Sequence, residues 1–499
     1  MKRVFLIFIL FIGLFFRFNN LNWDSNQHLH PDERFLTMVV SSMKLPQSLN
    51  EYLDQKMSFL NPSNIGYRFY VYGHFPLILN KFLVFFLQED NYNSITILGR
   101  FLSAFFDLLA IVFIFKISQI LFDDEKKTAY YIALLSAFFY SIFVLPIQLA
   151  HFFAVDSFLS FFMISSFYFI LCFIKKKNFL FLFLSALFLS LAFASKITAV
   201  FILPLFVILI FLSEKKYLKN FLIIIFFLSL SYFFLRFFDP YYFESKNFFN
   251  PRPSLIFKEN IQTLRNLTIK SLDNWYPPMV QWLSKNSFQH AVVNNMVFGM
   301  GLIQTIFVIM GMILLLKFKK KMENKKIIFI TLLWVVSVFV YQSLQSAPAL
   351  RYFIYLYPFF ALFGGYGFYW FKKKIRKKYQ EKLSYWLLGL TFYILLLIWP
   401  LMFSSIYNKK HTRVAASEWI YKSLPQQSII LGESWDDPLP LFMENNYGKN
   451  FVIHQLPVFD PDTSEKWQKM KELLNNADYY VLSSNRGWGS IITVPKKYP

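Results

Sequence analysis

Long apolar runs separated by short charged loops recur along most of this 499-residue chain. Runs of about 17 to 27 residues suffice to cross a bilayer as helices, so the pattern predicts a polytopic membrane protein. The first run, 4–18, follows Lys2-Arg3 as in a signal peptide. No small-residue cleavage site comes after it, so we expect a retained first helix. The other expected spans are 95–121, 129–147, 155–174, 178–194, 197–213, 220–237, 292–316, 326–345, 350–371 and 384–404.

Clusters of basic residues predict how these eleven spans are oriented. Short loops rich in Lys and Arg stay in the cytoplasm, and with eleven helices every cluster falls on one side together with the N-terminus. We therefore expect a multi-pass protein of the plasma membrane with a cytoplasmic N-terminus and an extracytoplasmic C-terminus. The clusters are Lys126-Lys127, Lys175 to Lys177, Lys215-Lys216-Lys219, Lys317 to Lys326 and Lys372 to Lys382.

Three larger segments are left outside by this topology. Segments of about 19–94 and 238–291 interrupt an expected transmembrane domain, 1–404, and 405–499 forms an extracytoplasmic domain. Within the first segment, the apolar piece 75–87 is too short to span a bilayer, and we expect an interfacial helix there.

The segment 405–499 is charged and punctuated by prolines. Its pattern predicts a helix at 414–424, short apolar runs at 428–431 and 451–456, a polar helix at 464–476 and a strand at 478–483. We therefore expect a small α/β domain beside an all-α membrane part. The chain stops soon after the last strand-like run without a closing element, which suggests a truncated reading frame.

Composition adds little beyond the membrane assignment. Apolar residues make up 56% of the chain and Phe alone supplies 66 residues, a bias that we attribute to codon usage. The net charge of +22 is mostly a topology signal, and no nucleic-acid motif accompanies it. Cys172 is the only cysteine, so no disulfide forms within one chain.

Ionisable residues gather at the expected outer membrane boundary. Burying charge at this depth is costly unless water, a partner or a substrate solvates it. Four separate connections contribute to the set, which comprises Asp32 and Glu33, His151 and Asp156, Ser195-Lys196, and Arg351-Tyr352.

This combination of acids and cations suits the transfer of a sugar from a lipid phosphate. An acceptor hydroxyl or amine must lose a proton, for which a carboxylate serves as the base. The leaving phosphate is already a good leaving group, but it needs Lys or Arg to stabilise its charge. A helix beginning at Pro31 would also favour an ionised Asp32.

The order of these features resembles GT-C glycosyltransferases of the protein O-mannosyltransferase type (glycosyltransferase family 39-like, bacterial), which include aminoarabinose transferases. The resemblance extends over roughly 1–404. The pieces that carry it are Asp32-Glu33 preceded by His30-Pro31, Gly99-Arg100-Phe101-Leu102-Ser103-Ala104, Asp156 in Phe153-Ala154-Val155-Asp156, Ala194-Ser195-Lys196, and Arg351-Tyr352 with Pro358 further on.

The resemblance implies a role for each of these residues. Asp32 would be the general base, Glu33 would orient it or shape the acceptor site, and Asp156 would be a second acid in the cavity. Lys196 and Arg351 would hold the donor phosphate. Three further residues are expected to line the site: His30, His151 and Tyr352.

Each of these residues also has a purely structural explanation. Asp32 and Glu33 could be ordinary acids of a first helical turn, and Asp156 could cap a helix. Lys196 could extend to the interface from a tight turn, and Arg351 likewise.

A divalent metal could be held by histidines of the expected external segments together with Asp32 and Glu33. The spacing of these histidines does not support such a site; they are His28, His30, His74 and His151. No cofactor is therefore certain, and metal binding stays an open possibility.

Other acidic motifs read as structural elements. Asp107 lies within the second helix, seven residues after Arg100, and we expect it to pair with that residue or with a neighbouring helix. Asp460-Pro461-Asp462 resembles the Asp-x-Asp element that binds a metal and a nucleotide sugar in soluble transferases, but we expect a turn there. We also favour turns for two distinctive pieces of the external domain, which could alternatively touch an acceptor glycan: Trp435-Asp436-Asp437-Pro438 and Ser483-Ser484-Asn485-Arg486.

The sequence thus predicts an integral-membrane, mannosyltransferase-like enzyme of the cell envelope. Its donor would be a polyprenyl-phosphate-linked sugar, and its acceptor an extracytoplasmic protein, lipid or glycan, with inversion after a single in-line attack. Two alternatives stay open. One is an oligosaccharide transferase or ligase with a diphosphate-linked donor, which would need more cations. The other is a lipid-sugar transporter or flippase, which would need polar residues near mid-bilayer.

Overall fold

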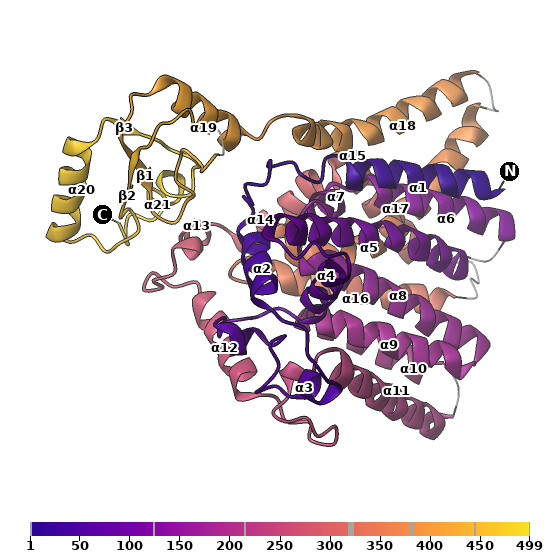
Figure 1. The fold of residues 1–499 in the computed structure, drawn as a ribbon. Helices are drawn as coiled ribbons and strands as arrows, with labels where there is room; N and C mark the ends of the chain where they lie inside the picture. The colour runs from indigo at the N-terminus through magenta and orange to yellow at the C-terminus, as the bar shows by residue number, and fades with distance from the viewer. Residues whose placement is uncertain are drawn as a thin grey trace.

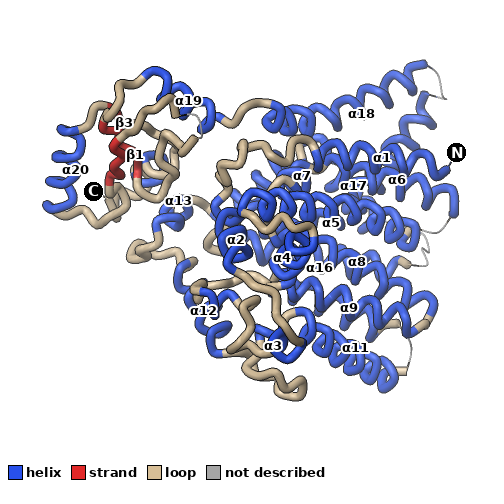
Figure 2. The backbone as a smooth tube through the Cα atoms, viewed as in Figure 1, coloured by secondary structure: helices blue, strands red, loops and turns tan. Residues whose placement is uncertain are grey.

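A computed structural model of the chain describes residues 2–122, 125–213, 216–317, 324–379, 383–443 and 446–498. Figure 1 shows a bundle of long helices and, at one end of it, a smaller part that contains the sheet. Helix dominates throughout, as Figure 2 shows by colour. Five lysines of the predicted basic clusters lie outside the described residues: Lys215, Lys319 to Lys321 and Lys382.

The bundle is built from the apolar segments. Its helices are α1 (Lys2–Phe18), α5 (Tyr92–Leu121), α6 (Lys126–Ile142), α7 (Val144–Ala150), α8 (Val155–Lys176), α9 (Phe179–Ser195), η2 (Ile197–Ile202), α10 (Leu203–Phe211), α11 (Tyr217–Phe238), η5 (Asn294–Met300), α15 (Leu302–Lys317), α16 (Lys325–Ser343), η6 (Leu350–Leu356), α17 (Tyr357–Tyr379) and α18 (Leu383–Ser404).

Each of the eleven predicted spans corresponds to one helix or to two consecutive helices in the bundle. Among the described residues, five helices are long and apolar enough to cross a membrane, or seven if two bent pairs each count as one span. The segments 4–18, 179–195 and 197–211 are shorter apolar helices. The chain is therefore a multi-pass membrane protein, as the sequence predicts.

The prediction of one continuous helix is wrong for one span. The segment 292–316 is not continuous, because the helices on either side of Gly301 meet at 111°. Gly301 has φ +100°, a left-handed backbone conformation that residues with a side chain rarely adopt. The second bent pair, α6 and α7, changes direction by 56°.

Close helix packing in the bundle depends on two glycines. A Cβ atom on Gly311 of α15 would lie 1.9 Å from the Phe363 carbonyl oxygen of α17, and one on Gly367 would lie 2.2 Å from the Phe307 carbonyl oxygen. Such approaches between backbones are a common basis of helix association in lipid. The two helices are thereby held in direct contact along the core.

The segments 19–94 and 238–291, which we call the external segments because the sequence predicts them outside, carry shorter helices. The first segment holds α2 (Pro31–Ser42), α3 (Leu49–Leu53), η1 (Pro62–Ile65) and α4 (Phe75–Phe86). The second holds η3 (Pro240–Tyr242), α12 (Leu255–Leu267), η4 (Pro277–Met279), α13 (Val280–Leu283) and α14 (Ser287–Val293). The predicted helix 75–87 is thus α4, whose position at the membrane surface stays a prediction.

The C-terminal segment forms a three-stranded parallel sheet in the order β2-β1-β3. Its elements are η7 (Ser405–Asn408), α19 (Thr412–Ser423), β1 (Ile429–Glu433), β2 (Val452–Leu456), α20 (Ser464–Asn476), β3 (Tyr479–Tyr480) and α21 (Trp488–Ile491). The predicted helices agree with these bounds, and the two predicted apolar runs at 428–431 and 451–456 correspond to β1 and β2. The predicted strand at 478–483 is shorter, because only two residues pair with β1.

The C-terminal segment packs on the second external segment. Val280 of α13 clusters with Phe459, Val494 and Tyr498, and the Lys497 ammonium donates to the Asn274 carbonyl oxygen at 2.6 Å. Arg34 of α2 also pairs with Asp437 at 2.9 Å. These contacts hold the sheet-containing part over the end of the bundle (Figure 1).

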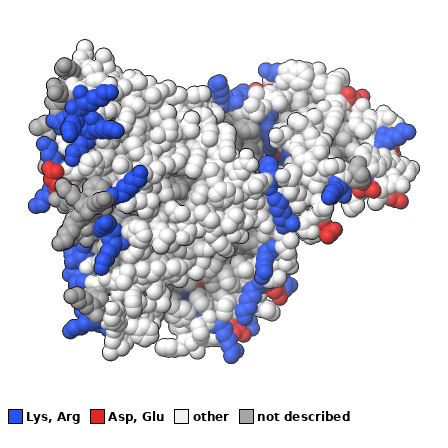
Figure 3. All heavy atoms as spheres, turned by 180° about the vertical axis from the view of Figure 1, so that it is seen from behind, with Lys and Arg blue, Asp and Glu red and all other residues white. Residues whose placement is uncertain are grey.

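Surface charge agrees with a membrane-embedded bundle. Figure 3 shows a broad uncharged band between Lys and Arg at one end and mixed charges near the C-terminal part. The basic last turns of α8 and α17 belong to the end of the bundle where the N-terminus lies (Figure 1). An apolar belt between two charged rims is the surface that a bilayer requires.

Candidate functional site

Asp32 lies in the first turn of α2, at the end of the bundle that faces the sheet. Pro31 occupies the first turn, and the His30 Nδ1 atom caps the helix by accepting from the Glu33 amide at 3.3 Å. Proline at this position starts a helix without the loss of a hydrogen bond. The positive end of the helix dipole then favours the ionised form of Asp32.

Two side chains from distant parts of the chain hold the Asp32 carboxylate. Arg351 of η6 donates to Asp32 Oδ2, and the Tyr72 hydroxyl donates to Oδ1 at 3.2 Å. Burial alone would raise the pKa of Asp32, but the Arg351 guanidinium outweighs this and holds that pKa below its usual range. Because its pKa is lowered, the carboxylate is ionised at neutral pH. One third of the side chain is exposed, so it is open to a ligand.

Asp156 and Lys196 form a second ion pair. The Lys196 ammonium donates to Asp156 Oδ1 at 2.8 Å, and both side chains are almost fully buried. Asp156 does not cap α8, since the cap position is Ala154 and carries no side-chain hydrogen bond.

Tyr352 brings the two ion pairs together. The Lys196 ammonium lies 5.1 Å from the centre of the Tyr352 ring, and the Arg351 guanidinium carbon lies 5.4 Å from it. Both distances are within the range of a cation–π interaction. The two cations therefore meet at one aromatic ring, and each carries its acid partner with it.

Glu33 points the other way and is fully buried. It receives two hydrogen bonds from Arg100, at 2.8 and 2.5 Å, and one from the Phe153 amide at 2.7 Å. Asp24 shares the same guanidinium at 2.8 Å. Glu33 has no exposed surface with which to contact a substrate, so it acts as a buried link between α2, α5 and the segment before α8.

Glycines allow the backbone to approach closely around these residues. A Cβ atom on Gly99 would lie 2.1 Å from the Phe153 ring, the residue whose amide binds Glu33. Gly73 follows Tyr72, its amide donates to the Ser195 carbonyl oxygen at 2.9 Å, and a Cβ atom there would lie 2.1 Å from the Ala194 carbonyl oxygen. Segment 70–74 therefore lies directly on the turn that carries Lys196.

The three predicted site-lining residues have different outcomes. Tyr352 lies between the ion pairs, and His30 caps α2 and stacks on Phe152 at 4.1 Å. The expectation that His151 lines the site is wrong. Its ring is fully buried, stacks on Tyr407 at 3.6 Å and contacts backbone carbonyl oxygens of Ile147 and Asn19. It supports the first external segment and lines no open surface.

Asp107 is a structural lock, as expected, but its partner differs from the one we named first. Arg17 of α1 donates to Asp107 at 2.5 Å, and the Tyr140 hydroxyl of α6 donates at 2.6 Å. Arg100 is instead engaged by Glu33 and Asp24. Asp107 thus joins three helices within the bundle.

The acidic motifs of the C-terminal part lie in loops that ion pairs hold in place. Lys466 binds Asp462 at 2.6 Å and the Asp460 carbonyl oxygen at 2.8 Å, which fixes the loop before α20. Asp436 and Asp437 both pair with Arg413, at 2.7 and 2.6 Å.

Sequence reasoning missed a tyrosine near the site. Tyr276, from the second external segment, contacts the ring of Trp435 at 5.9 Å. Burial raises the pKa of Tyr276, and the nearby Asp32 carboxylate and Tyr352 raise it further. Tyr276 therefore lies within electrostatic range of Asp32 and contacts the C-terminal part. Isolated aromatic residues in loops carry no pattern that would have singled it out, and the same holds for Tyr72.

The described residues do not fit a metal site. No group of three or more His, Cys, Asp or Glu side chains lies close enough to hold an ion in the described part of the chain. The partners of Asp32 are a guanidinium and a phenol, neither of which is a ligand suited to a divalent cation here.

Comparison with known proteins supports the fold. Residues 92–239 match the family model described as dolichyl-phosphate-mannose-protein mannosyltransferase. No curated protein matches the chain in sequence. Several solved structures of membrane glycosyltransferases do match in three dimensions.

Three of these structures are representative. The oligosaccharyltransferase AglB of Archaeoglobus fulgidus, in complex with an inhibitory peptide and a dolichol-phosphate, is 12% identical with a TM-score of 0.56, over 99% of this chain and 72% of that one. The Archaeoglobus fulgidus oligosaccharyltransferase with Zn and sulfate is 13% identical with a TM-score of 0.54, over 87% and 60%. ArnT of Cupriavidus metallidurans, bound to undecaprenyl phosphate, is 10% identical with a TM-score of 0.50, over 98% and 88%.

These similarities define the class of the fold. The chain matches 60% of the length of the zinc-bound archaeal enzyme and 88% of the length of ArnT. It has the GT-C fold that these polytopic membrane glycosyltransferases share, with a small sheet-containing part beside the bundle, and the predicted fold class is confirmed.

Proposed function

We propose that the protein is a glycosyltransferase that moves a sugar from a polyprenyl-phosphate donor to an extracytoplasmic acceptor. The observation that carries the proposal is the convergence of the Asp32–Arg351 and Asp156–Lys196 pairs around Tyr352. One acid can serve as the base while the cations hold the leaving phosphate. The GT-C fold and the matched mannosyltransferase model are consistent with this chemistry.

In the proposed reaction Asp32 removes the proton from the acceptor hydroxyl. The acceptor oxygen attacks the anomeric carbon from the side opposite the phosphate, and a new glycosidic bond forms. The bond between that carbon and the phosphate oxygen breaks, and its electron pair leaves with the polyprenyl phosphate. A single in-line displacement inverts the configuration of the sugar.

Arg351 and Lys196 hold the donor phosphate in this proposal. Each is paired with a carboxylate, so a bound phosphate would exchange one anionic partner for another. Once Arg351 turns to the phosphate, Asp32 loses the cation that lowers its pKa and becomes a stronger base. Donor binding would then activate the base.

The other residues support this arrangement. Glu33 positions α2 through Arg100, and Asp156 positions Lys196. We place the site on the extracytoplasmic face, with the N-terminus in the cytoplasm and with 405–499 as a separate external domain. A divalent metal is given no role, because the described side chains at Asp32 do not form a ligand set.

Transfer by the reconstituted protein tests the proposal. Wild type in liposomes is offered a panel of polyprenyl-phosphate sugars, and release of free polyprenyl phosphate is measured. We expect release from one donor and a loss of about 10²- to 10⁴-fold in Asp32→Asn. Asp273→Asn, at an exposed acid of the second external segment, is the matched control and should transfer normally. Wild-type transfer by Asp32→Asn would disprove the role of the base.

A further inference from the structure

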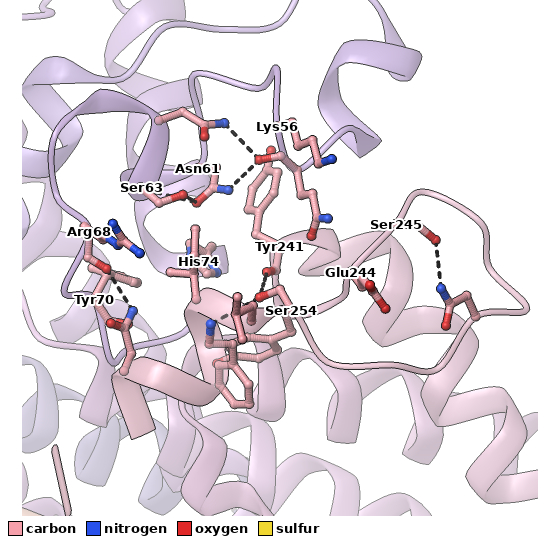
Figure 4. A pocket seen from close by; sticks show the side chains of 18 residues that line it. Lys56, Asn61, Ser63, Arg68, Tyr70, His74, Tyr241, Glu244, Ser245 and Ser254 are labelled. Atoms are coloured by element: carbon pink, nitrogen blue, oxygen red, sulfur yellow. Dashed lines mark hydrogen bonds between the residues drawn. The ribbon is translucent and has the colours of Figure 1, made fainter. Parts of the chain in front are cut away.

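A cavity of about 610 Å³ lies between the two external segments of the bundle, apart from the ion pairs at Tyr352. Figure 4 shows one wall formed by Asn61 and Ser63 and the other by Glu244, Ser245 and Ser254, with His74 between them. Nothing in the proposed transfer reaction uses these residues.

We infer that this cavity binds a neutral saccharide unit of the acceptor. Eight of its 18 lining residues are amides or serines, whose side chains both donate and accept hydrogen bonds as sugar hydroxyls do. The amides and serines that line it are Gln55, Asn61, Asn64, Asn250, Asn260, Ser63, Ser245 and Ser254. Tyr241, Tyr242 and Phe257 add ring surface for the apolar face of a sugar.

The charges of the lining favour a neutral ligand. Lys56 and Arg68 contribute positive charge and Glu244 negative charge, while Arg68 also pairs with Glu259 at 3.2 Å. The side chains of Gln55, Lys56 and Glu244 make no hydrogen bond or ion pair with any residue that the structure describes. They are therefore available to a ligand.

The cavity is held open by bonds between its walls. The Asn260 amide donates to the carbonyl oxygens of Arg68 and Tyr70, at 2.9 and 3.0 Å. The Ser58 and Tyr241 hydroxyls lie 2.8 Å apart. A cavity that exists before binding spares a ligand the cost of ordering its site.

His74 presents one ring nitrogen for binding. Its Nδ1 lies 2.7 Å from Asp239 Oδ1, and its amide donates to Asp239 Oδ2 at 2.9 Å. An ionised carboxylate only accepts, so Nδ1 is the donor. The Nε2 atom has no hydrogen bond to any residue in the described part of the chain, although only 6% of His74 is exposed and the residue lines the cavity.

Segment 70–74 links this cavity to Asp32. Tyr70 and His74 line the cavity, and Tyr72 donates to Asp32. The rings of Tyr70 and Tyr72 are 5.8 Å apart, so two tyrosines in contact connect the cavity to the carboxylate. An acceptor glycan with one sugar in the cavity can extend past these rings to the base. This step alone rests on the proposed function, because it assigns the bound sugar to the acceptor.

Binding of neutral disaccharides to the full-length protein in nanodiscs tests the inference by saturation-transfer NMR. We expect at least one of them to bind, and the double variant Gln55→Ala/Glu244→Ala to bind it about tenfold more weakly through two lost polar contacts. Gln262→Ala, at an exposed amide of α12 outside the cavity, is the matched control. Thermal unfolding of the variants shows whether they fold.

The possible outcomes separate this inference from the proposed function. Binding that persists in Asp32→Asn but weakens in the double variant supports the cavity, whatever happens to transfer. Absence of neutral saccharide binding, equal binding by the double variant, or binding of only glucuronate-containing disaccharides or inorganic phosphate would overturn it. In the transfer assay, the double variant should have a raised KM for the acceptor and an unchanged KM for the donor if the cavity binds the acceptor. A raised KM for the donor with an unchanged KM for the acceptor would contradict this assignment.

Discussion

At the scale of single residues, the two adjacent acids of α2 have separate tasks. Asp32 faces Arg351 and Tyr72 and keeps a third of its side chain exposed, whereas Glu33 is fully enclosed by Arg100 and the Phe153 amide. Neighbouring positions in a helical first turn point in different directions, so one side chain can meet substrate while the other anchors the helix.

Removal of Arg351 should change how activity depends on pH. Arg351 lowers the pKa of Asp32, so Arg351→Gln should raise that pKa and leave the base protonated at higher pH. The acid limb of kcat/KM is therefore expected to move upward, with a raised donor KM. Arg252→Gln, at an exposed external arginine, should leave the pH profile of transfer unchanged. An unshifted acid limb in Arg351→Gln would contradict the pairing.

The same pair contributes to stability with a defined sign. A carboxyl whose pKa is lowered on folding stabilises the folded state above its unfolded pKa, and this stabilisation is lost as pH falls through the lowered value. The contribution of Asp32 is therefore present at neutral pH and disappears below the usual carboxyl range.

Glu33 and Asp32 should differ in their effect on stability. Glu33→Ala leaves the buried Arg100 guanidinium with Asp24 as its remaining acidic partner, which should cost about 3 to 5 kcal/mol. Asp32→Asn should abolish transfer with a much smaller loss, because its pair is partly exposed. Thermal unfolding in detergent compares the two variants. Equal unfolding temperatures would show that Glu33 is not an anchor.

At the scale of elements, segment 70–74 determines how closely the first external segment approaches the turn after α9. Gly73→Ala would place a Cβ atom 2.1 Å from the Ala194 carbonyl oxygen, and the segment must move. We expect Tyr72 to leave Asp32 and transfer to fall at least tenfold. Gly389→Ala in α18, with nothing within 4 Å, should keep full activity. Normal transfer by Gly73→Ala would show that Tyr72 does not matter.

Most elements of this fold could be predicted because their signals are local. Apolar runs and basic loops located the spans of the bundle, and polar periodicity placed α20 at 464–476. The bend at Gly301 was missed, since a glycine inside an apolar run looks like any other helical position until its left-handed φ is known.

The site was only partly predictable for a related reason. Asp32, Asp156, Lys196 and Arg351 stand out as charges at a membrane boundary. Their pairing, and the contributions of Tyr72 and Asp24, depend on contacts between residues far apart in the chain. His151 illustrates the opposite error, because a polar residue at the boundary proved to be a buried support.

At the scale of the whole molecule, the orientation of the bundle is a prediction that labelling can test. Cys172 is the only cysteine and is buried, so Cys172→Ser gives a background without thiols. In that background Asp273→Cys should react with a membrane-impermeant maleimide added outside intact cells. Lys177→Cys should react only after the cells are opened. The reverse pattern would place the ion pairs on the cytoplasmic side and exclude the proposed topology.

The most direct test of the central claim measures donor binding and transfer together in Asp32→Asn. Wild type and variant are reconstituted with the donor that supports transfer, and bound donor and released polyprenyl phosphate are quantified in a single turnover. If Asp32 is the base and the cations hold the phosphate, the variant binds the donor but releases polyprenyl phosphate at least about 10²-fold more slowly. Release at the wild-type rate would contradict the account.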